Sequence, residues 1–399
     1  MLSAQPPVHS PLGVAALLAG ARAAVAGSST ARGRVERLLE ELYQPKGVLL
    51  TDSGTTALHL ALRLGVAERP GPVALPAYCC YDVATAADAA RTDFILYDLD
   101  PATLGPDWTS LRRAFDQGAR VVVAVHLYGI PVDLSAIHGL AGEAGVVIVE
   151  DAAQAAGARL GCMPAGSVGQ YAVLSFGRGK GITGGRGGAL LANTVEAAER
   201  LAVAAAMIGG QSSGGRDLAI LAAQWVLGRP SLYGLPLRMP FLRLGETIYR
   251  APEPPRAPSN AALGTLTRTL TLASAEAERR RSNAGRILAQ IGEQPGIATP
   301  RPPVGAVPGF LRLPVVVGST IAPALRSGLA RQLGVWPGYP QSLADLPGFG
   351  SRRLDAAQQP SGARLLADQL FTLPTHSLLG EASLHDLGEL VARACRGDR

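Results

Sequence analysis

The sequence predicts an α/β protein whose main sheet is mostly parallel. Short runs of apolar, often β-branched residues recur through the first half of the chain, and stretches with helical patterns separate them. These runs do not alternate between apolar and polar residues, which is typical of strands covered by helices on both faces. A length of 399 residues with 47% hydrophobic content is enough for two or three domain-sized units.

Strands and helices alternate through the first 207 residues. The predicted strands cover 47–50, 72–75, 93–97, 119–126, 146–150, 171–176 and 189–192. The predicted helices cover 55–64, 81–90, 134–144 and a stretch from 193 to about 207. Asp52 or Ser53 can cap the first helix. Ligands of parallel sheets bind beyond the carboxyl ends of the strands. Polar residues at these ends are Ser53, His126, Asp151 and Ser175.

The middle of the chain is less regular. Glycine and serine residues at 209–215 predict a mobile loop, and three prolines break an apolar segment at 218–244. The apolar runs within this segment are shorter than the ~20 residues that span a bilayer. We therefore expect an insertion that covers an active site or a dimer surface, in preference to a shallow membrane contact. Residues 251–258 resemble a linker.

The last third of the chain predicts a second, smaller α/β unit. Its predicted helices cover 260–291, 322–333 and 383–394, and a strand covers 310–317. We therefore divide the chain into residues 1–255, an N-terminal segment with a large domain, and residues 256–399, a small C-terminal domain.

Composition excludes several classes of protein. The net charge is +6 and no run of five like charges occurs, so nucleic-acid binding is not expected. The four cysteines lack the spacing of a zinc site, and they fit a reduced cytoplasm better than a disulfide framework. The N-terminus has no basic residue before its apolar part, unlike a secretory signal. We expect a cytoplasmic protein without a metal.

Lys180 is one of only two lysines, although the chain has 37 basic side chains. It lies in a glycine-rich segment, 177–188, between two predicted strands. Lysine can lose its proton when desolvated and then form a Schiff base, which arginine cannot. A lysine in such a loop is usually only a solvated charge. Nucleotide loops fit poorly here, because a strand rather than a helix follows the G-x-G-x-x-G match at 179–184 and Gly181 breaks a Walker A pattern.

A Schiff-base lysine indicates pyridoxal phosphate (PLP). This cofactor needs a carboxylate beside its pyridine nitrogen and backbone N–H groups around its phosphate. Asp151 follows a hydrophobic strand and meets the first need, and the turn at 53–56 opens a helix and meets the second. Taken singly, Asp151 could be a helix N-cap and the turn a capping box. Their order and spacing together favour the cofactor.

Several motifs in this order also point to one family. They are DSGTTALHLAL at 52–62, EDAAQA at 150–155, and Ser175-Phe176 followed by Lys180, with weaker matches at 261–264 and 373–376. Through them the chain resembles the DegT/DnrJ/EryC1/StrS family of PLP-dependent sugar aminotransferases, from about residue 47 to 193. The resemblance implies PLP fold type I: a large domain with a mostly parallel seven-stranded sheet, a smaller C-terminal α/β domain, and a homodimer.

The resemblance also implies roles for individual residues. Lys180 corresponds to the Schiff-base lysine and proton carrier, and Asp151 to the partner of the pyridine nitrogen. Gln154 corresponds to the side chain near the ring and its 3′-oxygen. The phosphate-binding residues correspond to Gly54, Thr55 and Ser175. The family's ring-stacking aromatic falls on Cys80, and we assign the stacking to Tyr81 beside it.

Two departures from the family pattern lie near the predicted site. Arg186 stands where the family has Glu in a Gly-Glu-Gly-Gly segment. The family's Asn-Tyr-Arg-Met loop, which reaches the partner subunit, is not intact: its Arg aligns with Arg256 and its Asn with Pro254. The part of the site that selects the acceptor is therefore expected to be unusual.

The resemblance implies ping-pong transamination, with glutamate as the amino donor and a keto sugar, nucleotide-linked in the family's manner, as the acceptor. Polysaccharide or secondary-metabolite biosynthesis is the corresponding pathway class. Two alternatives stay open. One is a non-catalytic or regulatory relative that binds PLP or a sugar nucleotide. The other is a PLP-dependent sugar dehydratase, which Lys180 disfavours because those relatives carry His at this position.

Overall fold

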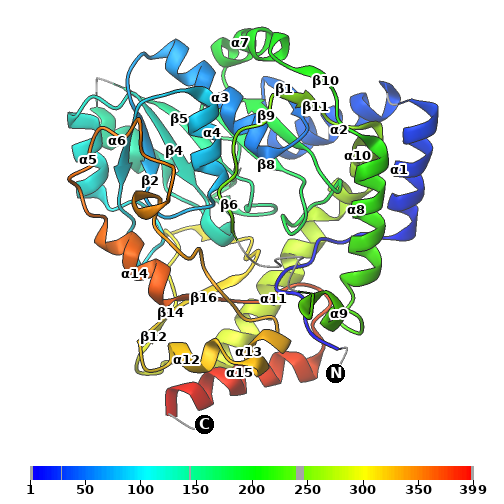
Figure 1. Cartoon of the computed structure of the whole chain (residues 1–399), viewed down its shortest axis with the longest axis vertical. Helices are drawn as coiled ribbons and strands as arrows, with labels where there is room; N and C mark the ends of the chain where they lie inside the picture. The colour runs from blue at the N-terminus through cyan, green and yellow to red at the C-terminus, as the bar shows by residue number, and fades with distance from the viewer. Residues whose placement is uncertain (1–2, 28, 143–144, 240–246, 397–399) are drawn as a thin grey trace.

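The computed structural model describes residues 3–27, 29–142, 145–239 and 247–396. Its largest sheet has seven strands in the order β1-β9-β8-β5-β4-β2-β3 (Figure 1). Every neighbouring pair is parallel except the two that involve β9, which runs antiparallel to β1 and β8. The predicted mostly parallel seven-stranded sheet is therefore confirmed. The strands are β1 (Gly47–Thr51), β2 (Val73–Pro76), β3 (Phe94–Tyr97), β4 (Val121–Val125), β5 (Val147–Asp151), β8 (Tyr171–Ser175) and β9 (Gly188–Ala192).

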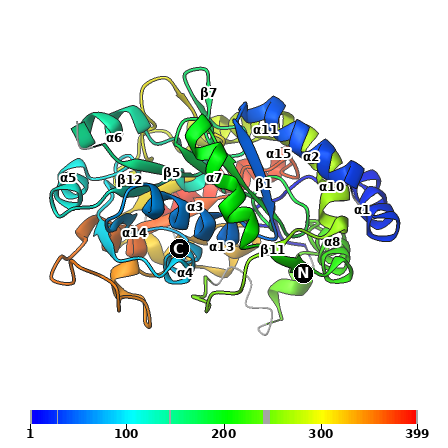
Figure 2. The ribbon, with the colours of Figure 1, turned by 90° about the horizontal axis from the view of Figure 1, so that it is seen from above.

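Helices cover both faces of this sheet, which explains why its strands are apolar throughout. One hydrophobic cluster joins the sheet to α3 (Gly54–Glu68), α4 (Asp82–Ala90) and α7 (Val195–Ala206). On the other face, α5 (Trp108–Asp116) and α6 (Leu134–Ala141) cover the β3 end of the sheet. The β1 end is covered by α2 (Ser29–Tyr43) and α10 (Asn260–Thr269), which lie beside α1 (Val14–Ala26) (Figure 2).

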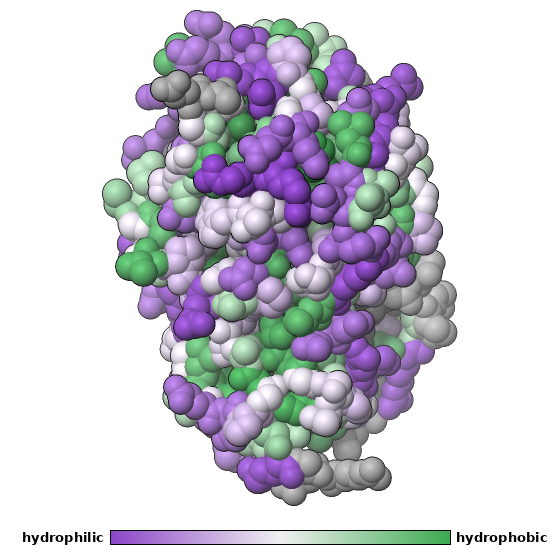
Figure 3. Space-filling view, turned by 90° about the vertical axis from the view of Figure 1, so that its left-hand side faces the viewer, coloured by the Kyte–Doolittle hydropathy of each residue, from purple (hydrophilic) through white to green (hydrophobic). Residues whose placement is uncertain are grey.

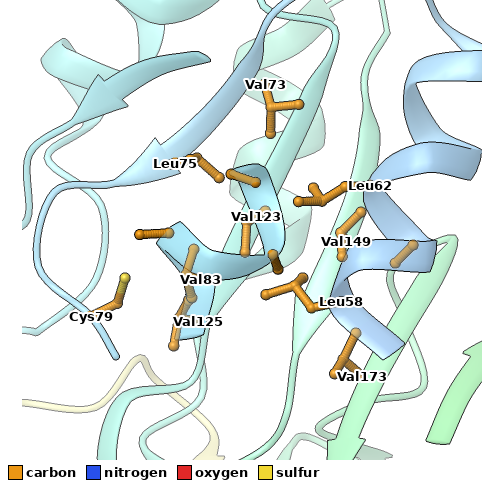
Figure 4. Close-up of a cluster of buried hydrophobic side chains, with 14 of the residues drawn as sticks. Leu58, Leu62, Val73, Leu75, Cys79, Val83, Val123, Val125, Val149 and Val173 are labelled. Atoms are coloured by element: carbon orange, nitrogen blue, oxygen red, sulfur yellow. The ribbon is translucent and has the colours of Figure 1, made fainter. Parts of the chain in front are cut away.

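Side chains one helical turn apart on α3 form the centre of the first cluster. Leu58 and Leu62 face Val149 in β5 and its neighbours, and Val83 of α4 approaches Val125 (Figure 4). These residues are all buried. Burying a Val or Leu side chain contributes about 1.5–3 kcal/mol relative to exposure, so this layer fixes α3 firmly on the sheet. The N-terminus of α3 is thereby held at the carboxyl edge of β1.

A second unit is built on a four-stranded sheet in the order β12-β14-β16-β15. Its hydrophobic cluster joins these strands to α11 and α15. The elements after α10 are the η4 turn (Leu270–Leu272), α11 (Ala273–Ile291), β12 (Ile297–Ala298), β13 (Ala306–Val307), β14 (Leu313–Val317), α12 (Ala322–Leu325), α13 (Gly328–Gln332), β15 (Trp336–Pro337), η5 (Leu343–Asp345), α14 (Ser361–Gln369), β16 (Leu370–Leu373) and α15 (Glu381–Arg396). A smaller C-terminal α/β unit is thus present, while its boundary at residue 256 remains a prediction.

Two segments differ from the expectation. The stretch 209–215, predicted as a mobile loop, contains β10 (Gly209–Gln211), which pairs with β11 (Arg256–Ala257), and the start of α8 (Gly214–Leu227). The paired residues, such as Gly209 and Arg256, lie far apart in the sequence, so this pairing gave no local signal. The described part of the apolar segment forms α8 and α9 (Gly234–Leu237), and α8 packs against α1 and α10. Residues 240–244 of that segment lie outside the described residues.

The surface is mixed in character. Figure 3 shows hydrophilic and hydrophobic side chains interspersed on the side of the molecule that lies at the left of Figure 1. Trp108 of α5 and Leu365 of α14 are among the exposed apolar residues. Within the described ranges, we find no helix that combines the length and the apolar character needed to cross a membrane.

A buried carboxylate organises the sheet just below its carboxyl edge. Glu150 in β5 is 1% exposed. Its two oxygens accept hydrogen bonds from three backbone amides of the turn at 166–169 and from Nε2 of His126, which lies 2.8 Å from Oε1. Nδ1 of His126 accepts from the amide of Val132, so Nε2 carries the ring hydrogen. Burial raises the pKa of Glu150, but the bonds from His126 and the amides bring it below its ordinary value.

We expect Glu150→Gln to lower the free energy of unfolding at pH 7 by about 3 kcal/mol, because the new amide group would face donors and leave them unpaired. The measurement is chemical denaturation followed by circular dichroism. Glu199→Gln, at an exposed position of α7, is the matched control and should change stability by less than about 0.5 kcal/mol.

The pH dependence provides a further check of this prediction. A carboxylate with a depressed folded-state pKa contributes stability above its unfolded-state value of about 4.3 and loses the contribution as the pH falls through the folded-state value. The difference between Glu150→Gln and the parent should therefore shrink below about pH 4. An equal difference at pH 3 and pH 7 would contradict the role of the charge.

Candidate functional site

The candidate site lies at the carboxyl edge of the large sheet. β1, β8, β5, β4 and β2 all run in the same direction, so the residues that follow them gather at one edge. Asp151 ends β5 and Ser175 ends β8, while His126 directly follows β4. The structure thus brings the polar strand-end residues of the sequence to the same side of the molecule. His126 is committed to Glu150 and is not available to a ligand.

The turn after β1 forms an anion cradle. Ser53 caps α3, with its Oγ accepting from the amide of Thr56 at 3.1 Å. The amides of Gly54 and Thr55 belong to the first turn of α3 and have no acceptor within that helix. A Cβ at position 54 would lie 2.7 Å from Cβ of Ser175, so only glycine permits the contact between this turn and the end of β8. Backbone amides and hydroxyl groups therefore converge at a helix N-terminus, where phosphate groups bind.

Asp151 is a buried carboxylate with one oxygen available. The residue is 7% exposed, and its Oδ1 accepts from the amide of Ala153 at 3.0 Å. Burial raises its pKa, while that amide and the positive charge of Lys180 oppose the rise. A cation placed against Asp151 would restore its ordinary ionisation. The arrangement suits a protonated ring nitrogen.

Lys180 lies on the connection between β8 and β9, two neighbouring antiparallel strands. Its side chain is half-buried and makes no hydrogen bond or ion pair with the residues that the structure describes. Its charge acts on Asp151 and on the thiol of Cys80, so these three groups share one site. Burial raises the pKa of Cys80 to about 12, with Asp82 adding to the rise and Lys180 opposing it. The thiol of Cys80 is therefore held in its protonated form and is a poor nucleophile.

Gln154 connects the site to the second unit. Its Oε1 accepts from the amide of Tyr128 at 3.0 Å, and its Nε2 donates to the hydroxyl of Tyr339 at 2.7 Å. The amide of Tyr339 in turn donates to the hydroxyl of Tyr78 at 2.8 Å. The sequence had singled out Gln154 but not Tyr339, which follows β15 and lies far away along the chain. Three tyrosine rings thus pack near the predicted 3′-oxygen side of the site.

Tyr81 lies beside the site but is committed to packing. It is 3% exposed and belongs to the hydrophobic cluster of α3 and α4. Its hydroxyl lies 3.5 Å from the carbonyl oxygen of Gln341. Burial raises the pKa of this hydroxyl to about 12, while the contact with Gln341 opposes the rise and Cys79 and Cys80 add to it. The stacking role of Tyr81 stays a prediction.

The two departures from the family pattern meet at the cradle. Arg186 pairs with Asp52, with 3.9 Å between Nη2 and Oδ2. The carbonyl of Arg256 accepts from the amide of the same Asp52 at 3.0 Å. Asp52 also receives the hydroxyl of Thr56 at 2.7 Å. Both arginines therefore adjoin the start of the cradle in this chain, and Arg186 has a partner that accounts for its charge.

These residues fit PLP. The cradle at the start of α3 is shaped by glycine for a phosphate, Asp151 keeps one oxygen for the pyridine nitrogen, and Lys180 has an unpaired amine beside it. Among the residues that the structure describes, no group of three or more His, Cys, Asp or Glu side chains could hold a metal ion.

Comparison with known proteins gives relatives for the first half of the chain. A model of the DegT/DnrJ/EryC1/StrS aminotransferase family matches residues 16–214. The chain is 35% identical over 152 residues to an L-glutamine:2-deoxy-scyllo-inosose aminotransferase of Streptoalloteichus tenebrarius, covering 37% of this chain and 35% of that protein. It is 33% identical over 169 residues to a GDP-perosamine synthase of Caulobacter vibrioides, covering 42% and 45%. The matches thus span less than half the length of these curated relatives.

Solved structures resemble the whole chain. The crystal structure of the aminotransferase TlmJ from Streptoalloteichus hindustanus superposes with a TM-score of 0.74 at 23% identity, covering 98% of each chain. The predicted fold, type I of the PLP-dependent aminotransferases, is therefore confirmed. The family match includes β1 to β9, from which the cradle, Asp151 and Lys180 all come. The chain belongs to the DegT/DnrJ/EryC1/StrS aminotransferase family.

Proposed function

We propose that this protein is a PLP-dependent aminotransferase that moves an amino group from an amino acid to a keto sugar. The observation that carries the proposal is the meeting of an unpaired lysine amine with a buried carboxylate beside a helix N-terminus. Each of these features has an ordinary structural explanation alone. Their convergence at one sheet edge matches the three chemical needs of a single cofactor.

Different residues of the chain would then bind the cofactor, orient it and transfer the proton. PLP, when bound, supplies the electron sink that lets a proton leave the α-carbon of an amino acid. The amides of Gly54 and Thr55, with the hydroxyl of Ser175, would hold the phosphate. Asp151 would keep the pyridine nitrogen protonated, and Gln154 would orient the ring through its oxygen substituent. Lys180 would hold the cofactor covalently and, once displaced by the donor, carry the proton as general base and acid.

The substrates are the finer part of the proposal. We infer glutamate as the amino donor and a keto sugar, nucleotide-linked as in several relatives, as the acceptor. The names of the two relatives above, which contain 2-deoxy-scyllo-inosose and GDP-perosamine, support an acceptor of this class. The tyrosines around Gln154 offer hydroxyl groups and ring faces that suit such a polyhydroxylated ring. A homodimer in the cytoplasm completes the proposal.

Lys180→Ala should abolish transamination and the visible absorbance of the purified protein, because no other amine lies at the site. The only other lysine, Lys46, provides a matched control, since it is exposed and precedes β1 at the edge of the sheet opposite to the site. Lys46→Ala should keep the absorbance and the rate within about twofold, as surface substitutions usually do. Turnover is followed with glutamate and a panel of keto sugars.

The same absorbance tests the proposed reaction. In the parent protein it should bleach when glutamate is added, because the amino group is transferred to the cofactor. Absorbance that no amino donor changes would favour a non-catalytic PLP-binding relative. A normal rate in Lys180→Ala would sink the assignment.

Asp151→Asn should lower kcat at least about 100-fold while PLP remains bound, because the neutral amide no longer keeps the ring nitrogen protonated. Single-turnover kinetics with glutamate and the cofactor content of the purified variant are the measurements. Asp116→Asn, at an exposed position of α5, is the control and should match the parent. A variant with full activity would contradict the role of Asp151.

Gly54→Ala should weaken PLP affinity by about tenfold or more, because its methyl group would meet Ser175 and displace the cradle. Affinity is measured by titration of the apoprotein with PLP. Gly139→Ala in α6, where a Cβ would meet nothing within 4 Å, should leave the affinity unchanged. Equal affinities of the two variants would argue against a phosphate at this turn.

A further inference from the structure

A guanidinium is buried directly behind the lysine loop. Arg280 in α11 is 1% exposed, and it is the largest of the fully buried side chains among the described residues. Its Nη2 donates to the carbonyl of His9 at 3.1 Å and to that of Gly181 at 3.5 Å. Gly181 directly follows Lys180 in the chain. Arg280 therefore joins the loop that carries the lysine to the N-terminal segment.

The partner of this charge ties in a third segment. Glu276, one turn earlier in α11, lies 3.6 Å from Nε of Arg280 and is itself 5% exposed. Its Oε1 accepts from the amide of Ser377, which precedes α15. Nε of Arg280 has no hydrogen-bond partner among the described residues. Burying this charge is costly, and the shell of backbone carbonyls and one carboxylate offsets the cost only in part. A buried ion pair of this kind contributes little net stability, which points to a second role for Arg280.

The lysine loop is fitted against this support on both sides of Lys180. Gly181 has a φ of +84°, and a Cβ there would lie 2.8 Å from Nη1 of Arg280. Gly179 has a φ of +72°, and a Cβ there would lie 2.8 Å from a methyl group of Val8. Glycine is needed at both positions, for backbone conformation and for space. The backbone of Lys180 is thus pressed onto the N-terminal segment and Arg280.

The N-terminal segment is itself anchored. The amide of Gln5 donates to the carbonyl of Gln332, and Nε2 of His376 donates to the carbonyl of Pro6 at 2.7 Å. Asn283, also in α11, donates to the carbonyl of His376 at 3.1 Å. One face of α11 therefore holds the segment around residues 375–377, the N-terminal segment and the lysine loop together.

We propose that Arg280 is a positioning residue for Lys180, acting through the carbonyl of Gly181 and the segment at residues 5–9. Through these bonds it fixes the place of the lysine relative to Asp151. The inference rests on the proposed function, because the position of Lys180 matters only if that amine reacts. The inference goes beyond the proposed function because it assigns a role to a residue outside the large sheet.

The test uses the full-length protein with Arg280→Met and Glu276→Gln combined. The double substitution removes both charges, so that neither is left buried alone, and Gln keeps an acceptor for Ser377. Arg279→Met, exposed on the same helix, is the matched control. Hydrogen exchange measured by mass spectrometry reports on residues 177–187 directly, and visible absorbance during dilution reports on cofactor release.

We expect exchange in residues 177–187 and release of PLP to accelerate by about tenfold or more in the double variant, with the control unchanged. Arg280→Lys with Glu276 retained, which keeps a positive charge beside that carboxylate and a donor, should have a smaller effect than the double substitution. Unchanged exchange and release in the double variant would overturn the proposal. So would a lower melting temperature with unchanged exchange in residues 177–187.

Gly181→Ala, made in the parent and in the double variant, separates an effect on the loop from a general loss of folding. Gly181→Ala pushes the loop away from Arg280 without removing any charge, and should also accelerate exchange and release. Its effect should be smaller in the double variant than in the parent, because both act on one contact. If the effects of Gly181→Ala and of the double substitution on exchange simply added, the proposal would be overturned. Exchange is measurable without the cofactor, so absence of visible absorbance in the parent would reject the proposed function, while the exchange results would still decide whether Arg280 holds the loop.

Discussion

The site depends on the shared direction of the strands in the large sheet. Because β1, β8 and β5 are parallel in space, the turn after β1, the end of β8 and the end of β5 reach one edge. Helices on both faces bury these strands and leave only the edge for a ligand. β9 is the exception: its reversed direction returns the chain from the lysine loop into the sheet between β1 and β8. The pairing of the strands therefore places three chemically different groups at one edge, and this placement does not depend on contacts between their side chains.

Much of this could be predicted from the sequence, because the signals are local. Every predicted strand of the first half has a counterpart in the large sheet, and Asp151 lies at the end of its strand as expected. The glycine at position 54 and the cap at Ser53 are likewise readable from the residues around them. The family match then confirmed the assignment of the chain, while the roles of individual residues remain predictions.

The parts that could not be predicted depend on contacts between distant segments. Tyr339 reaches Gln154 across 185 positions of sequence, and Arg280 reaches the loop at Gly181 across 99. Neither residue lies in a motif, and Arg280 is the middle one of three consecutive arginines at 279–281. Only the middle member is buried, because helical periodicity turns Arg279 outward and Arg280 inward. The pairing of β10 with β11 was missed for the same reason.

One contact of the apolar segment limits how this fold can be altered. The hydroxyl of Thr183, three residues after Lys180, is hydrogen-bonded to Oε1 of Gln224 in α8 at 3.2 Å. α8 also packs on α1 and α10, so it is built into the framework and is not a detachable cover. Grafting the corresponding segment from a relative would remove a support of the loop that carries Lys180. Engineering of this chain should therefore retain α8 and vary the residues that follow it.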